Sequence, residues 1–180
     1  MSLEAALARR RTIRELQPHA LTDHEIGQLL WAAQGVTHER GRRTAPSASS
    51  TFPLELYTVT AAGLDHYAPA EHVLEPLDDS DIRPALQAAA GDQPFVGTAP
   101  LLIIITAVTS RVAPRHGPER AIRYADLEAG HAGQNLLLQA VALDLGGVAI
   151  GSFDDDEVSR LGGFPVGESA RYLFAIGRPR

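Results

Sequence analysis

A cluster of basic residues near the start of the chain is the first feature whose chemistry suits ligand binding. Arg10, Arg11 and Arg14 lie within five residues of one another, together with the hydroxyl of Thr12. Guanidinium groups bind phosphate dianions through paired, charge-assisted hydrogen bonds. The same composition suits a solvated helix end, because cations are stabilised at helix C-termini. The segment therefore predicts either a small phosphate site or an exposed basic helix end.

A polar loop over residues 38–52 holds the second candidate. Loops of this length inside a compact domain are usually functional or disordered. Its centre consists of small and hydroxyl residues, among them Pro46, Ser47, Ala48 and Ser49. Such residues let a backbone approach a ligand closely, and an ordinary flexible loop is the alternative.

A glycine-rich strand end is the third candidate. The stretch Gly146–Phe153 reads as a strand that ends at Gly151 and Ser152 and thereby exposes backbone N–H groups. It lacks the G-x-G-x-x-G spacing of dinucleotide-binding folds. The acidic run Asp154–Glu157 that follows is typical of the first turn of a helix, where negative charge is stabilised. We therefore predict no metal site there.

Histidine and cysteine content excludes several chemistries. The chain has no cysteine, so disulfides, cysteine-bound metals and thiol nucleophiles are excluded. None of its seven histidines lies in an H-E-x-x-H pattern. His131, on the longest predicted helix, is interpreted as an interior or interfacial side chain, with a substrate-facing role as the alternative.

Size and charge narrow the class of protein. The 180 residues predict a single domain, residues 1–180. A net charge of −6 argues against an extended nucleic-acid surface. No apolar run approaches the ~20 residues that cross a bilayer, and the first residues lack the apolar core of a secretory signal. The expectation is a cytoplasmic enzyme.

Hydrophobic periodicity predicts interspersed helices and strands without a regular βαβ repeat, which indicates an α+β fold. The predicted helices cover residues 2–11, 22–34, 79–90, 119–145 and 154–161. The predicted strands cover residues 54–59, 101–107, 147–150 and 171–176, with 101–107 as a central strand and a hairpin or meander in 63–78. Gly130 and Gly133 interrupt the longest helix, and we expect each to allow a close approach by another element.

The order of these features resembles the nitroreductase superfamily from about Leu7 to Arg178, and within it the branch of SagB-type azoline dehydrogenases. The segments that carry the resemblance are Arg10–Arg14, Leu29–Gly35, Arg43–Ala48, Pro53–Tyr57, Leu127–His131 with Gln134–Leu136, Ile150–Asp155 and Ala175–Gly177.

The resemblance implies a nitroreductase-like fold with a mixed, mostly antiparallel sheet and the long helix at the interface of a homodimer. It implies FMN at that interface and NADH or NADPH as electron donor, with ping-pong reduction of small electrophiles such as nitroaromatics or quinones. By the same resemblance, Arg10, Thr12 and Arg178 or Arg180 hold the phosphate, with Arg11 close by. The other residues implied are Arg14 at the pyrimidine edge, Pro46–Ser49 from the partner chain, Gly151 and Ser152 at the ring edge, and Gln93.

Two alternatives stay open. Azoline dehydrogenases carry a Lys-Tyr pair upstream of the long helix, and Arg115 and His116 occupy that place here. Arginine is a poor base, although His116 can act as one. Oxidation of thiazoline or oxazoline peptides is one alternative, and a non-enzymatic flavin-binding protein is the other. The natural substrate and the choice between NADH and NADPH are not determined by the sequence.

Overall fold

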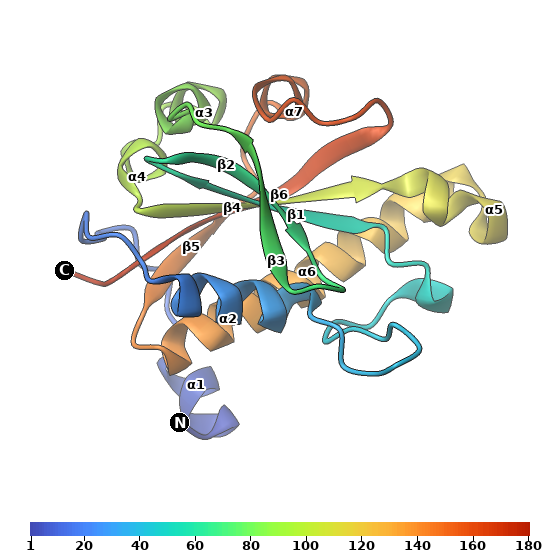
Figure 1. Ribbon diagram of the computed structural model, residues 1–180, viewed down its shortest axis with the longest axis horizontal. Helices are drawn as coiled ribbons and strands as arrows, with labels where there is room; N and C mark the ends of the chain where they lie inside the picture. Colours follow the sequence, from blue (N-terminus) through green and yellow to red (C-terminus); the bar gives the residue numbers. More distant parts are fainter.

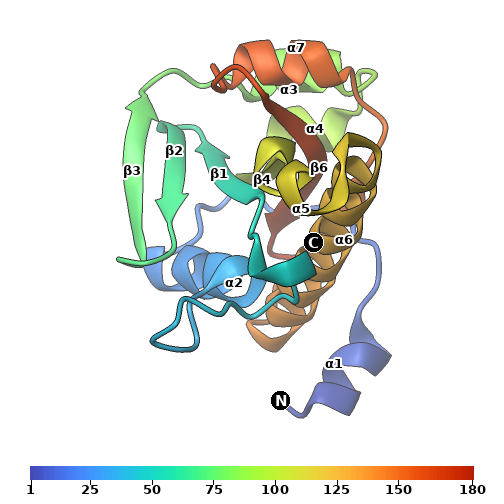
Figure 2. The same ribbon diagram turned by 90° about the vertical axis from the view of Figure 1, so that its right-hand side faces the viewer.

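The computed structural model describes residues 1–180 as a six-stranded sheet with helices on both faces (Figures 1 and 2). The strands are β1 (Leu54–Thr60), β2 (Gly63–Ala68), β3 (Val73–Asp78), β4 (Leu101–Val108), β5 (Gly146–Ile150) and β6 (Glu168–Gly177). The α-helices are α1 (Leu3–Arg9), α2 (Asp23–Gln34), α3 (Arg83–Ala89), α4 (Pro94–Thr98), α5 (Ala113–His116), α6 (Pro118–Ala142) and α7 (Asp155–Leu161). Short 3-10 turns, η1 (Ala48–Ser50) and η2 (Thr109–Arg111), precede β1 and α5.

The sheet has the order β3-β2-β1-β4-β6-β5, and each of its strand pairings is antiparallel. The one parallel contact is an isolated bridge between Thr12 and Gly147, on the outer edge of β5. The α+β fold with a mostly antiparallel sheet that the sequence predicted is therefore confirmed.

Strand β4 lies in the middle of the sheet and is buried on both sides. Its odd-numbered residues, such as Ile103, pack under α2 and α6, and its even-numbered residues, such as Ile104, pack under α3, α4 and α7. A strand covered on both faces reads as a continuous apolar run, which explains the unbroken sequence Leu101–Ile105. Figure 2 shows the two helical layers on opposite sides of the sheet.

Helix α6 packs closely on the sheet through Gly133. A Cβ atom on Gly133 would stand 2.4 Å from Cζ of Phe174 in β6, so the predicted close approach is confirmed there. Gly130 is exposed and has no neighbour of this kind within 4 Å, so within the chain the prediction fails at that residue. Helix α2 begins at the predicted capping box, in which Thr22 and Glu25 bond each other's backbone N–H.

Three helices differ from the prediction. The helix expected over 79–90 begins only at Arg83, because the Asp78 and Asp81 side chains accept hydrogen bonds from the backbone of Ser80 and Arg83 and form turns instead. The short helices α4 and α5 were not predicted, since five and four residues are too few for a periodic pattern. No helix of the chain combines the length and apolar character needed to cross a bilayer.

Candidate functional site

The basic segment lies along the outer edge of β5. The backbone N–H of Ile13 donates to Gly147 O at 2.9 Å, next to the Thr12–Gly147 bridge. Gly146 leaves room for this approach, because a Cβ there would stand 2.8 Å from Cδ1 and 3.2 Å from Cβ of Ile13. The bridge is parallel, and beyond it the chain turns toward the C-terminus, where Leu16 bridges Pro179.

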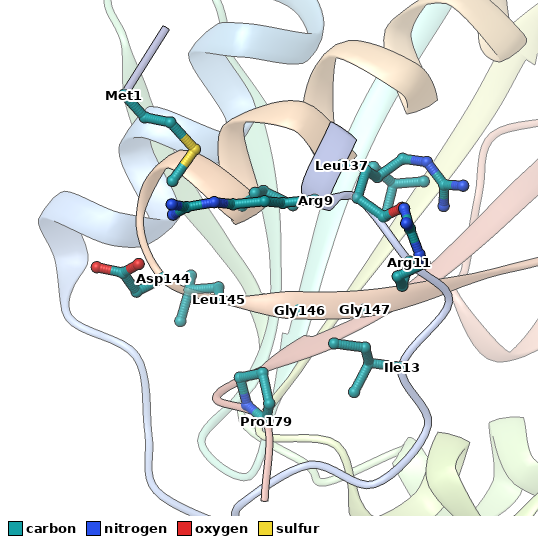
Figure 3. A pocket seen from close by; sticks show the side chains of 12 residues that line it. Met1, Arg9, Arg11, Ile13, Leu137, Asp144, Leu145, Gly146, Gly147 and Pro179 are labelled. Atoms are coloured by element: carbon teal, nitrogen blue, oxygen red, sulfur yellow. The ribbon is translucent and has the colours of Figure 1, made fainter. Parts of the chain in front are cut away.

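A cavity of about 200 Å³ opens where this segment leaves α1 (Figure 3). Arg9, Arg10 and Arg11 line it, and Asp144 is its one acidic residue. Arg11 folds back, and its Nη1 donates to the carbonyl oxygens of Ala8 and Arg10 at 2.9 and 2.7 Å. The cavity is therefore positively charged, and the side chains of Arg9 and Arg10 make no hydrogen bond within the chain.

The C-terminus runs beside the same segment but offers only one of the two predicted arginines. Arg178 is engaged elsewhere, because its Nη2 donates to Oε1 of Glu25 in α2 at 2.6 Å. Arg180 is exposed, its backbone N–H donates to Glu15 O at 3.1 Å, and its Nε donates to Leu16 O at 3.0 Å. Of the pair, Arg180 is the one that lies against the basic segment.

The end of β5 brings four more predicted residues together. Gly151 and Ser152 are exposed, and no hydrogen bond within the chain uses either backbone N–H. Nε2 of Gln93 donates to Ser152 O at 3.4 Å and to Ala90 O at 2.7 Å. Helix α4, which begins just after Gln93, places the ring of Phe95 under the Arg14 guanidinium. Cζ of Arg14 lies 5.8 Å from the centroid of this ring. Free N–H donors, an amide and a guanidinium thus surround one exposed strand end.

The serine-rich loop lies apart from these residues. In Figure 1 it is at the right-hand end with α5, whereas the C-terminus and the start of α2 are at the left. Ser47 Oγ accepts from Phe52 N at 2.9 Å, and Ser49 Oγ lies 2.9 Å from His116 Nε2. Arg115 Nη1 also donates to Ser49 O at 3.1 Å. One chain therefore does not bring Pro46–Ser49 to the basic segment.

The two candidate histidines differ in their surroundings. His116 contacts Ser49 and packs edge-on against Tyr124, with ring centroids 5.0 Å apart. His131 is exposed on α6 and has no hydrogen-bond partner in the chain, so the interior position considered for it is wrong. The chain has no group of three or more His, Asp or Glu side chains placed to hold a metal ion, and Asp154 instead caps α7 by accepting from Glu157 N.

The sequence did not reveal a buried polar cluster behind the loop. Glu128 of α6 is 2% exposed and Gln34, the last residue of α2, is 0% exposed. Arg43 Nη1 donates to Gln34 Oε1 at 2.8 Å, whereas Oε1 of Glu128 and Nε2 of Gln34 are buried without a hydrogen-bond partner. Burial raises the pKa of Glu128 to about 7, although Ser47, Arg43 and Gln34 each act to lower it. The sequence could have indicated this cluster, because Glu128 falls in the same helical stripe as the apolar residues Ala125, Ala129 and Ala132.

Large apolar side chains are exposed on α1, α2 and α6. They are Leu3, Leu7, Trp31, Ile122 and Leu127. Patches of large exposed apolar side chains on a globular protein commonly mark an interaction surface.

Comparison with known proteins gives consistent likenesses. The sequence model of the nitroreductase family matches residues 7–178. A protein of Methanocaldococcus jannaschii, provisionally named a nitroreductase, is 36% identical over 184 residues, which cover 99% of this chain and 91% of that protein. A crystal structure from Ralstonia eutropha, also provisionally named a nitroreductase, has a TM-score of 0.90 and 29% identity, and the match covers 100% of this chain and 84% of that one. The NADPH:FMN oxidoreductase of Vibrio harveyi, solved with NAD+, has a TM-score of 0.74 and 22% identity over 98% of this chain and 68% of its own.

Proposed function

This chain belongs to the nitroreductase family of oxidoreductases, and on that premise we propose that it is an FMN-dependent enzyme. In this proposal NADH or NADPH is the electron donor, and the second substrate is a small electrophile such as a nitroaromatic or a quinone. The two substrates bind in turn, in ping-pong fashion. The similar Vibrio harveyi protein is named an NADPH:FMN oxidoreductase.

The observation that carries the proposal is the set of hydrogen-bond donors along the outer edge of β5. Arg10 and Thr12 lie at the start of this edge, and they offer guanidinium and hydroxyl donors suited to a phosphate. Arg180 lies against Glu15 and Leu16, which follow the basic segment. Gly151 and Ser152 lie at the other end with unused N–H groups. A flavin mononucleotide carries a charged phosphate at one end and the polar edge of its ring system at the other, so it can use both groups of donors.

Each residue has a definite task in this arrangement. Arg10 and Arg180 bind the phosphate, and the N–H groups of Gly151 and Ser152 donate to the polar edge of the ring system. Arg14 places positive charge beside the pyrimidine side, where it stabilises negative charge, and Gln93 keeps Ser152 in place. The bound flavin supplies the hydride chemistry, and the protein supplies position and electrostatics.

The proposal requires two copies of the chain. Pro46–Ser49 lie at the other end of the molecule from the basic segment, so they can complete only a site on a second copy. The exposed apolar residues beside α6 provide a surface for that copy, and obligate dimers typically bury ~2,000 Å² or more. We therefore propose a homodimer whose sites are each built from both chains, and a cytoplasmic location.

The test begins with the cofactor. Flavin released by heat from the purified protein should chromatograph as FMN, and anaerobic addition of NADH or NADPH should bleach the flavin absorbance. Reoxidation by a nitroarene or a quinone then distinguishes a reductase from a protein that only binds flavin. Recovery of FAD, or no flavin even after reconstitution with FMN, would falsify the proposal.

A matched pair of arginine variants tests the site itself. Arg14→Ala removes a charge-assisted hydrogen bond worth about 1.5–3 kcal/mol, or roughly ten- to a hundredfold in FMN affinity. The control is Arg160→Ala, because Arg160 is exposed and pairs only with Glu157 on the same helix. We expect Arg14→Ala to weaken FMN binding and lower the flavin reduction potential, and Arg160→Ala to do neither. Equal affinities in the two variants would mean that the basic segment is only a solvated helix end.

A further inference from the structure

Strand β6 contains a β-bulge close to the strand end that carries the free N–H groups. Ile105 of β4 pairs with Tyr172, and the next residue of β4 pairs with Ala170, so Arg171 is an extra residue between the two pairs. Ala170 packs in the core under α3, α4 and α7, whereas Tyr172 packs against the core under α2 and α6. Residues two apart in a regular strand share one face. The bulge breaks this alternation and lets Arg171 lie on the same face as Tyr172.

The guanidinium of Arg171 uses none of its hydrogen-bond donors within the chain. Nη1 lies 3.6 Å from Oδ1 of Asp126 in α6, which is its one ion-pair contact and is too long for a hydrogen bond. Nε is buried and has no acceptor. Nη1 and Nη2 also lack an acceptor, but they are not buried, and the side chain is 20% exposed. The two terminal nitrogens therefore present free donors at the surface.

A largely buried guanidinium without an acceptor needs an explanation. The group is always charged and carries five N–H donors, and buried polar groups that lack a partner are rare in native proteins. Bulges are common beside active sites, where they change the direction of a side chain. The bulge and the unused donors together indicate that Arg171 serves a ligand from outside the chain.

Arg171 lies beside the ring-edge half of the proposed flavin site. Gly151 follows the last residue of β5, and Tyr172 precedes the residue of β6 that pairs with it. A Cβ on Gly151 would stand 4.0 Å from Cε2 of Tyr172, so the two residues are neighbours. On α6, Gly130 lies one turn after Asp126 and is exposed, with open space where a Cβ would stand. A molecule that reaches the ring edge therefore lies close to Arg171, with room beside the helix.

We propose that Arg171 determines substrate specificity: its Nη1 and Nη2 bind a carboxylate of the electron-accepting substrate, which is an aromatic acid such as a nitrobenzoate. This inference rests on the proposed function, because a ligand at this place is a substrate only if flavin lies at the end of β5. A guanidinium matches a planar carboxylate through two parallel hydrogen bonds. The ring of Tyr172 on the same face favours an aromatic body for the ligand.

The electron donor is a second source of an anion. NADPH carries a phosphate on its adenosine ribose, at the far end of the molecule from the nicotinamide that must meet the flavin ring. Arg171 lies beside the ring edge, so the carboxylate of the acceptor is the better match. The experiments below distinguish the two sources.

The contact between Arg171 and Asp126 predicts two effects of opposite sign. The side chain of Asp126 is 54% exposed, so it can turn into solvent when a ligand carboxylate takes its place. Removing the charge of Asp126 should strengthen anion binding, because a like charge next to the ligand is lost. Removing the charge of Arg171 should weaken anion binding. A pair with a structural role alone would show no such opposition, since the loss of either member would break the same contact.

The first test measures binding without turnover. Benzoate and its uncharged analogue benzamide are titrated by calorimetry into the purified, oxidised protein at neutral pH. The variants are Arg171→Gln, Arg171→Lys and Asp126→Asn. The control is Arg160→Gln, which removes the same charge from an exposed arginine that pairs with Glu157 on α7.

The expected affinities follow from the charges. Arg171→Gln should bind benzoate about ten- to a hundredfold more weakly, the effect of a lost charge-assisted hydrogen bond, and its affinity for benzamide should not change. Arg171→Lys should recover part of the benzoate affinity, because lysine keeps the charge and loses the planar fork. Asp126→Asn should bind benzoate about two- to fivefold more tightly, the size of a solvent-exposed charge interaction. Arg160→Gln should match the wild type.

The second test follows the two half-reactions separately by rapid mixing. The reduced protein is reoxidised by 4-nitrobenzoate or by the uncharged 4-nitrobenzamide, and the oxidised protein is reduced by NADPH or by NADH. At low substrate concentration, Arg171→Gln should slow reoxidation by 4-nitrobenzoate about ten- to a hundredfold and leave the rate with 4-nitrobenzamide unchanged. A loss confined to NADPH would assign Arg171 to the phosphate of the donor and overturn its assignment to the acceptor.

The outcomes separate this inference from the function beneath it. Benzoate affinity in Arg171→Gln equal to that in Arg160→Gln, or equal losses for benzoate and benzamide, would overturn the inference and leave the flavin site standing. A protein that holds no flavin but binds benzoate through Arg171 would overturn the proposed function and keep the anion site. If Arg171→Gln does not fold, Asp126→Asn decides, because its side chain is half exposed; unchanged or weaker benzoate binding in that variant would then overturn the inference.

Discussion

Replacing Gly133 by alanine tests how closely α6 must pack on the sheet. The added Cβ would stand 2.4 Å from Cζ and 3.1 Å from Cε1 of Phe174, whereas carbon atoms in contact prefer about 3.5–4.0 Å. Phe174 is fully buried, and its ring packs against Tyr172 with centroids 4.7 Å apart. The ring has little room to move away, so the helix and the strand must separate.

Two opposing terms set the size of the effect. Extra volume in a well-packed core costs about 1–3 kcal/mol. Alanine in place of glycine in a helix contributes about 1 kcal/mol in the other direction. The net loss expected for Gly133→Ala is therefore about 0–2 kcal/mol. For a chain of this size each kcal/mol lowers Tm by about 2–4 °C.

Gly27→Ala is the matched control, because Gly27 also lies inside a helix. The atom closest to its added Cβ is Nε2 of His72 at 3.5 Å, an ordinary contact, so only the gain of about 1 kcal/mol should appear. Unfolding is followed by thermal denaturation at one protein concentration, since the stability of a dimer depends on concentration. We expect the free energy of unfolding of Gly133→Ala to be about 1–3 kcal/mol lower than that of Gly27→Ala, because the two variants differ only in the packing cost.

A second background makes the reasoning about Gly133 refutable. Phe174→Leu removes the ring that the added Cβ would meet, so Gly133→Ala in that background should lose its packing cost and become stabilising. The coupling of the two changes is then read from a double-mutant cycle. A Gly133→Ala protein as stable as Gly27→Ala, or a cost that persists with leucine at position 174, would show that the contact with Phe174 does not require the glycine.

Three further outcomes are expected. Burial opposes a charge on His66, but its hydrogen bonds to Glu55 and Glu75 outweigh this and raise the pKa of the imidazole. The stabilisation by the charged imidazole is therefore present at pH 6 and is lost as the pH rises through the raised pKa. We expect His66→Gln to lower the free energy of unfolding, measured with urea, more at pH 6 than at pH 9. Neither the wild type nor a variant with Lys-Tyr in place of Arg115–His116 should oxidise a thiazoline peptide quickly, as judged by loss of two hydrogens in the mass spectrum; fast conversion by the wild type would favour the azoline activity. Leu127→Glu should convert the dimer to monomer in sedimentation velocity, and an intact dimer would place the interface elsewhere.

Much of the fold was predictable because local patterns and the final packing agree. The capping box at Thr22 starts α2, and the periodic alanines of α6 define its buried stripe. The unbroken apolar run of β4 indicated a central, buried strand, and the structure confirms it. Burial on both faces removes the alternation that tells one face from the other, so the run did not show which residues face which helical layer. Short helices such as α4 and α5 were missed because one turn of helix carries no repeat.

The sequence predicted which residues belong to the candidate site better than it predicted which residues they contact. The pairing of Arg178 with Glu25 joins residues 153 positions apart, and no local pattern reports it. His131 was assigned by its place on a helix, and only the packed structure shows that its face of α6 points outward. Glu128 was overlooked because a single glutamate among alanines resembles a solvent-facing residue until the sheet covers it.

The separation of the two halves of the proposed site predicts that stability and function are linked in this protein. The basic segment depends on the edge of β5, and the serine-rich loop depends on α2 and the first half of α6. The shared core of β4, β6 and α6 joins these elements. A second copy can meet both halves only if that core holds them at a fixed distance and angle. A core change such as Gly133→Ala, which touches neither half, should therefore weaken FMN binding along with stability, whereas Gly27→Ala should leave FMN binding unchanged. Unaltered FMN affinity in a destabilised Gly133→Ala protein would show that the halves adjust to each other independently of the core.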